Sequence, residues 1–176
     1  MRYLFVLILS ISSWAFSQTK ISWNENRPLK WTDFTGNIDR TSEHRAVTYS
    51  GIEYNYSFSI SAEGEVSVEA EIGCFFIQEY SWSYHDSQTK ELLKHEQLRF
   101  DISELHARKM RKRVAEYDFT EDAENEMAII YAEVMQELMD MQVKYDEETN
   151  HSKNTEKQKE WNALIQSELN ALSDYK

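Results

Sequence analysis

Apolar and polar side chains alternate along two stretches in the first half of the chain. They do so from residue 52 to residue 60 and again from residue 66 to residue 76. Period-two alternation is typical of strands that bury one face. The residues between the stretches include Gly64, which suits a turn that needs positive φ. The pattern predicts an antiparallel β-hairpin over about residues 48–60 and 65–77.

The second half changes to helical spacing, with apolar residues recurring at intervals of three and four. We expect helices over about residues 89–117, 121–144 and 155–172, with a polar loop over residues 145–154. Residues 29–34 fit either a short strand or a loop. Strands followed by helices predict an α+β fold. In this fold the first helix is central and its apolar stripe packs on the aromatic face of the hairpin.

Composition and charge narrow the class of protein. A chain of 176 residues forms one core and is too short for two ordinary domains. The formal net charge is −12, and the only basic cluster, residues 108–113, lies within a predicted helix. We expect this cluster to be a solvated helix face flanked by acidic segments and not a phosphate site. Nucleic-acid binding is therefore not expected, because phosphate contacts need clustered Lys and Arg on a basic surface. Cys74 is the only cysteine, so no internal disulfide can form, and we expect a small buried side chain.

The N-terminal residues read as a secretory signal peptide. Arg2 precedes an apolar run over residues 3–11, and Ala15-x-Ser17 supplies small residues for a signal peptidase. We expect residues 1–17 to be removed and residues 18–176 to form one exported domain, periplasmic or extracellular. The apolar run is short for a bilayer span, so no membrane association is expected after cleavage. An uncleaved anchor is the alternative.

One segment of the first predicted helix carries candidate chemistry. It reads His95-Glu96-x-x-Arg99, where a zinc peptidase has H-E-x-x-H. In the full motif the two histidines bind one zinc ion, and the glutamate activates the metal-bound water. Arg99 cannot replace a histidine ligand, because its guanidinium stays protonated and offers no lone pair. Its fixed charge would also repel a divalent cation at His95.

The pattern extends well beyond those five residues. It continues as Leu92-Leu93-x-His95-Glu96-Gln97-x-Arg99-Phe100-Asp101-Ile102-x-Glu104-x-x-x-Arg108. Further pieces are Leu29-Lys30-Trp31-Thr32-Asp33-Phe34-Thr35-Gly36, Ser81-Trp82, Tyr145-Asp146-x-Glu148-Thr149-x-His151-Ser152 and Gln158-x-x-Trp161. Together they resemble a bacterial family of exported proteins with a domain of unknown function, usually described as a predicted zinc-dependent protease. The chain departs from this family at Arg99, where the family has histidine, and at Ser152, where it has glycine.

The resemblance implies a site and leaves several functions open. It implies that His95 and His151 are metal ligands, that Glu96 is the catalytic base and that zinc is the cofactor. With Arg99 in place we expect zinc to bind weakly or not at all, and the domain to bind a protein or peptide without cleaving it. One alternative is an active metallohydrolase with an altered ligand set that adds Glu91. The other is an unrelated structural α+β protein.

The remaining polar residues near the motif have ordinary interpretations. Arg99 is expected to form an ion pair with Glu96 or Glu91 and so to fill the place of the metal. His106 lies about 16 Å farther along the helix at 1.5 Å per residue, which is too far for the same ion. His44 and His85 are expected to be solvated surface residues.

Overall fold

The computed structural model describes residues 19–176, and the predicted signal peptide lies outside this range. The predicted hairpin is confirmed. Strands β3 (Ser50–Ile60) and β4 (Val66–Ile77) pair antiparallel, and β1 (Lys20–Ser22) pairs with the other edge of β4. Gly64 in the turn has φ +84°, a backbone conformation that glycine adopts without steric cost.

Three long helices follow, as predicted: α1 (Lys90–Glu116), α2 (Ala123–Thr149) and α3 (Thr155–Ala171). Helix α1 begins at the Thr89 N-cap, whose hydroxyl accepts a hydrogen bond from the Leu92 amide. Helix α2 ends five residues later than expected, so the prediction of a loop at 145–149 is wrong. Tyr145 and Thr149 are fully buried one turn apart, and they continue the apolar stripe through an otherwise charged segment.

Short elements connect these parts. Residues 29–34 contain a 3-10 helix, η1 (Trp31–Asp33), where a strand or a loop was expected. A two-stranded sheet joins β2 (Ala46–Val47) to β5 (Trp82–Ser83), with further 3-10 turns at η2 (Gln78–Tyr80), η3 (His85–Ser87) and η4 (Ser173–Tyr175). Strand β2 of this small sheet contacts α1.

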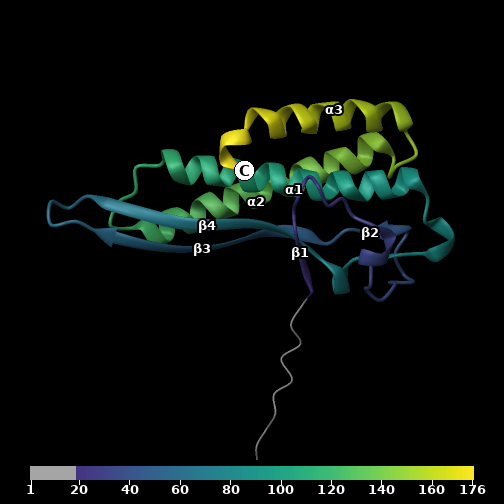
Figure 1. Ribbon diagram of the computed structural model, residues 1–176, viewed down its shortest axis with the longest axis horizontal. Helices are drawn as coiled ribbons and strands as arrows, with labels where there is room; N and C mark the ends of the chain where they lie inside the picture. The colour runs from purple at the N-terminus through teal and green to yellow at the C-terminus, as the bar shows by residue number, and fades with distance from the viewer. Residues whose placement is uncertain (1–18) are drawn as a thin grey trace, which may run out of the picture.

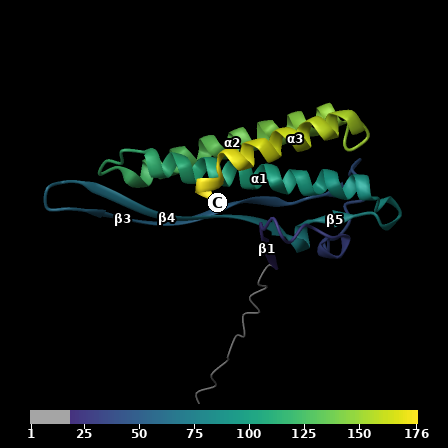
Figure 2. The ribbon, with the colours of Figure 1, turned by 45° about the horizontal axis from the view of Figure 1, so that its top comes forward.

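Helix α1 is the centre of the molecule, as its pattern predicted. It packs on β3 and β4 on one side and on α2 and α3 on the other (Figures 1 and 2). Its core residues Ile102, Leu105 and Met110 are completely buried. Cys74 is buried beneath it, and burial raises the pKa of its thiol well above the usual range. The thiol is therefore an unreactive core group.

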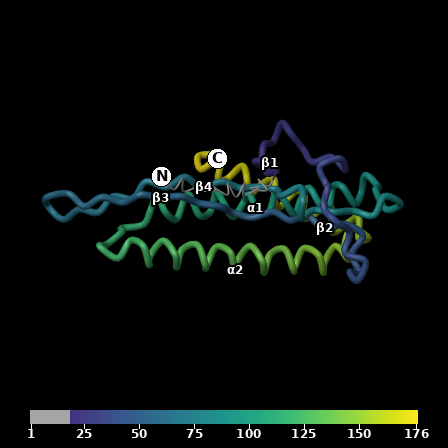
Figure 3. Tube along the Cα trace, turned by 90° about the horizontal axis from the view of Figure 1, so that it is seen from below, coloured from purple at the N-terminus to yellow at the C-terminus, as the bar shows by residue number. Residues whose placement is uncertain are grey.

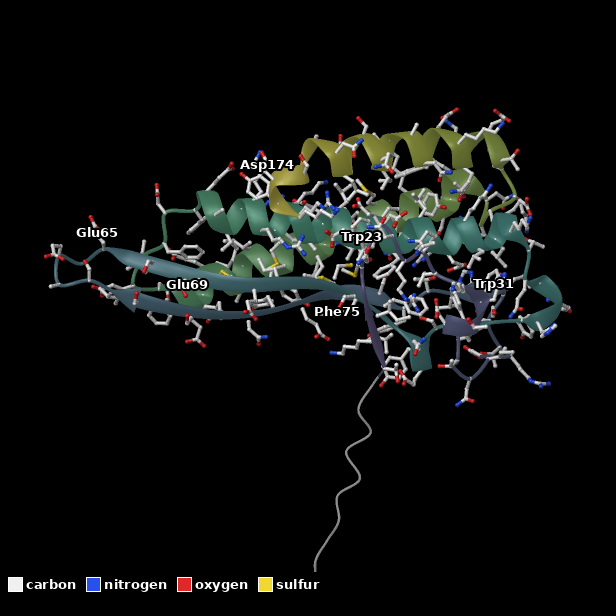
Figure 4. The ribbon with its side chains drawn as sticks, in the orientation of Figure 1. Trp23, Trp31, Glu65, Glu69, Phe75 and Asp174 are labelled. Atoms are coloured by element: carbon white, nitrogen blue, oxygen red, sulfur yellow. The ribbon has the colours of Figure 1, made fainter. Side chains whose placement is uncertain are left out.

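The hairpin turn extends past the ends of the helices (Figures 1 and 3). Phe58 and Ile60, on the strand β3 near this tip, are 45% and 47% exposed. Glu65 and Glu69 mark the same region in Figure 4. Within residues 19–176 no helix is long and apolar enough to cross a bilayer.

Candidate functional site

His95 lies in the first half of α1, and residues of α2 and α3 hold its ring in place. Its Nδ1 atom is 3.3 Å from Gln158 Oε1, which also accepts the Tyr145 hydroxyl at 2.8 Å. Because Gln158 Oε1 is an acceptor in both contacts, Nδ1 carries the proton. The Tyr145 ring stacks on the imidazole at a centroid distance of 4.6 Å. The imidazole is therefore fixed with its Nε2 atom turned toward Asp146.

Asp146 of α2 stands between His95 and Arg99. Its Oδ1 atom is 3.1 Å from His95 Nε2, without the direction of a good hydrogen bond, and its Oδ2 atom pairs with Arg99 Nη1. Arg99 Nη2 also donates to Gln142 Oε1 at 3.1 Å. Burial opposes ionisation of Asp146, but His95 and Arg99 outweigh it and hold its pKa below the usual value. Asp146 is therefore a carboxylate at neutral pH.

The expected ion pair of Arg99 with Glu96 or Glu91 is therefore wrong. Helix α2 runs alongside α1 and presents Asp146 and Gln142 to the guanidinium. Glu91 points to solvent, with no contact to Arg99. The carboxylate of Asp146, on the neighbouring helix, reaches the guanidinium of Arg99. Glu96 and Glu91, on the same helix as Arg99, do not.

Glu96 is buried, at 3% exposure, and its Oε2 atom has no hydrogen-bond partner. Burial raises the pKa of this carboxyl group, against the opposing effects of His95, Thr48 and Arg99. The Thr48 hydroxyl donates to the Glu96 backbone oxygen at 3.3 Å, which ties α1 to the segment before β3. A buried carboxyl group with a raised pKa and a free oxygen can accept or donate a proton to a bound molecule.

These side chains open onto one cavity of about 750 Å³. It is lined by residues 42–47, Ser87, Thr89, Leu92, His95, Glu96, Arg99, Asp146 and residues 151–153. His151 thus faces the same cavity as His95 although 56 positions separate them in the chain. At the rim its ring meets His44 edge-on, with centroids 5.1 Å apart. Glu91 and His106 are not part of this cavity.

The turn that carries His151 has an unusual backbone. Asn150, His151 and Ser152 have φ of 46°, 49° and 76°, in the left-handed region that L residues other than Asn and Asp seldom adopt. The His151 amide donates to the Asp146 carbonyl at 3.0 Å and closes α2. This geometry gives a physical reason for the glycine expected at position 152. Strained turns of this kind concentrate at functional sites.

The side chains that the structure describes around His95 do not form a zinc site with three protein ligands. Within residues 19–176 no three His, Cys, Asp or Glu side chains are arranged to hold a metal ion. Arg99 fills the second ligand position as a permanent cation, and both ring nitrogens of His95 face protein groups. A zinc centre with three protein ligands does not fit this arrangement. The assignment of His95 and His151 as ligands and of Glu96 as base stays a prediction.

Sequence reasoning missed Asp146, Gln142 and Gln158 as parts of the site. Gln142 and Asp146 are four residues apart on α2, a spacing that places both on one helix face. Gln158 and Asp146 belong to the family-like segments, so the resemblance contained the signal. The end of α2 hides it, because the sequence predicts a loop at residues 145–149 where the structure has helix.

Comparison with known proteins gives a match to a protein family. A family model described as a bacterial protein of unknown function (DUF922) matches residues 79–152, which include α1, α2 and the turn that carries His151. No curated protein and no solved structure matches the chain. The expected resemblance to a bacterial family of unknown function is confirmed, whereas the protease description stays a prediction. Residues 79–152 of this chain are thus similar to the bacterial family DUF922.

Proposed function

We propose that this domain is a zinc-peptidase-like binding module in which an internal ion pair takes the place of the metal. The observation that carries the proposal is the Arg99–Asp146 pair at the second ligand position of the motif. The guanidinium supplies a fixed positive charge where the ion would stand, and Asp146 balances it. A pair of this kind keeps the shape of the pocket without an ion.

The surroundings of His95 support descent from a metal site. Metal-binding histidines commonly donate their second ring N–H to an oxygen that fixes the ring orientation. Gln158 Oε1 has that relation to His95 Nδ1, with Tyr145 sharing the same oxygen. The contact that would orient His95 as a metal ligand is thus present, although Arg99 stands at the position of the second ligand.

The module binds a protein or peptide segment in the 750 Å³ cavity. Its wall carries both charge signs, because Arg45, Lys153 and Glu43 all line it. At its base, Glu96 Oε2 is a buried acceptor with no partner, which a backbone N–H of a bound peptide would satisfy. Export of the mature chain stays part of this proposal. N-terminal sequencing of chain recovered outside the cytoplasm tests it, and an intact Met1 would contradict it.

An active metallohydrolase with an altered ligand set is the second candidate. His95 Nε2 and Asp146 Oδ1 are 3.1 Å apart. Two ligands on one tetrahedral zinc, each about 2.0–2.1 Å from the ion, are about 3.3 Å apart. Asp146 therefore replaces Glu91 as the carboxylate to consider beside His95 and His151.

Zinc titration of the mature chain, residues 18–176, separates the two candidates. Wild type is expected to bind zinc weakly or not at all, and Arg99→His to gain affinity by removing a cation and adding an imidazole four residues after His95. Adding His151→Ala or Asp146→Ala to Arg99→His then identifies the third ligand by loss of that gain. Arg113→His, on the exposed end of the same helix, is the matched control.

Tight zinc binding by the wild-type protein would favour the active metallohydrolase. Stoichiometric zinc in purified wild type, held as tightly as in Arg99→His, would show that the guanidinium does not occupy the metal position. Peptide hydrolysis lost in Glu96→Gln would then support the altered-ligand hydrolase.

A further inference from the structure

A second hollow lies on the other side of α1, away from the cavity of Glu96. It is a groove of about 530 Å³ between α1 and α3, and Pro28 and Leu29 also line it. Leu29 is held there because its amide donates to Gln97 Oε1 at 2.6 Å. The volume is within the range of small-ligand sites, roughly 300–1,000 Å³. No residue of this groove lines the first cavity.

The groove has an apolar floor. The floor is formed by Leu29, Leu93, Leu98, Ile165 and Leu169. Four of these side chains are at least nine-tenths buried, and Leu93 is half-buried. The α1 residues along the groove run from Lys90 to Asp101, which is about 16 Å at 1.5 Å per residue. A ligand with an extended apolar chain can contact the floor over this length.

One end of the groove is positively charged. Lys90 and Lys94 lie one helical turn apart at the rim, and neither has a carboxylate within ion-pair distance among residues 19–176. Most of the other lysines of this acidic chain are paired with glutamates, as Lys157 is with Glu160. Two unpaired lysines beside an apolar groove favour an anionic group there.

The other end disfavours an anion. Asp101 lies there, and its Oδ1 atom already accepts Trp23 Nε1 and Gln97 Nε2, both at 2.8 Å. A ligand does not need to satisfy this carboxyl group, and its charge would repel a second anion. The groove therefore has a direction, with an anionic head at the lysines and an apolar chain running toward Asp101.

We propose that the groove between α1 and α3 binds a single-chain amphiphile with a carboxylate head, such as a free fatty acid. The carboxylate lies between Lys90 and Lys94, and the acyl chain lies along Leu93, Leu98 and Ile165. This site is independent of the proposed function of the first cavity, and either can fail without the other.

Calorimetric titration of the mature chain with dodecanoate, below its micelle concentration, tests the proposal. One dodecanoate per chain is expected, and Lys90→Glu with Lys94→Glu should lower affinity by about tenfold or more. Lys157→Glu with Lys159→Glu is the matched control, because it reverses the same charge on exposed positions of α3 outside the groove. That control should change affinity less than twofold.

Two further ligands and two variants complete the design. Dodecyltrimethylammonium has the same chain with a cationic head and should bind at least tenfold more weakly, and acetate should not bind. Leu93→Gln should weaken dodecanoate binding while circular dichroism confirms the fold. Absence of saturable binding, equal binding of the cationic amphiphile, or equal losses in both lysine double variants would overturn the proposal. So would dodecanoate binding that is lost in Arg99→Gln, since it would place the ligand in the first cavity.

Discussion

Breaking the Arg99–Asp146 pair should cost far more than breaking a surface pair. Arg99→Met keeps much of the side-chain volume but leaves the Asp146 carboxylate with His95 alone. Removing one partner of a fully buried pair costs about 3–5 kcal/mol. Here the two side chains remain 20% and 18% exposed. We therefore expect a loss of about 2–3 kcal/mol in the free energy of unfolding at pH 7.

A double-mutant cycle isolates the pair. Asp146→Asn alone leaves Arg99 with Gln142 and should cost about 1–2 kcal/mol, while the double variant should lose less than the sum by about 1–3 kcal/mol. Urea unfolding followed by circular dichroism gives all four free energies. The surface pair Arg113–Glu137, with side chains 35% and 42% exposed, is the control and should show a coupling of about 0.5 kcal/mol.

Acid should erase the difference between wild type and Arg99→Met. The pKa of Asp146 is lowered in the folded protein, so its ionised form stabilises the fold above its unfolded pKa. This stabilisation is lost as pH falls through the lower, folded pKa, where the carboxylate that Arg99 neutralises disappears. Additive single-variant effects, or a difference between the two proteins that is unchanged in acid, would refute the account of the pair as a coupled charge site.

Three further predictions concern single residues. Ser152→Gly should stabilise the fold by about 1 kcal/mol, because φ at this position is +76°. Lys153→Gly is the control, because Lys153 has no positive φ, and it should not stabilise the fold. Equal effects of the two substitutions in urea unfolding would contradict this prediction. Glu96→Gln should raise the melting temperature at pH 7 more than at pH 4. The reason is that the pKa of the Glu96 carboxyl group is raised in the folded protein, so ionisation of this group lowers stability as pH rises through that pKa. Glu91→Gln, at an exposed position, should not change the melting temperature at either pH. His106 is fully buried with its pKa lowered to about 4, so stability should fall by about 3 kcal/mol as pH drops from 6.5 to 4, and His106→Leu should flatten that slope.

Periodicity predicted most of the fold because each long element buries one regular face. The alternation in β3 and β4 and the 3–4 spacing in α1 and α3 define those faces, and the structure has the elements within two residues of their expected ends. The exception is the end of α2, where Tyr145 and Thr149 are the only buried positions among residues 145–149. A segment with only two apolar-facing positions among charged residues has the sequence pattern of a loop. Its helical state depends on the packing of Tyr145 and Thr149 against His95 and Gln158, which the sequence alone does not reveal.

The site was partly predictable for a different reason. The motif placed Glu96, His95 and Arg99 on one helix, and the family resemblance brought His151 to the same cavity. The partner of Arg99 could not be found from spacing along α1, because it depends on how α2 lies beside α1. Local sequence rules describe neighbours three and four residues apart, whereas Asp146 is 47 positions from Arg99.

The hairpin that extends beyond the helices also makes the chain sensitive to aggregation. Among the strands of residues 19–176, β3 is paired on one side only, so its eleven residues present an open row of backbone donors and acceptors. Glu63 and Glu65 lie in and beside the turn, and their charges repel a second copy. If substitution removed these charges, the exposed Phe58 and Ile60 would make this edge the site where strands of different molecules first join into fibrils.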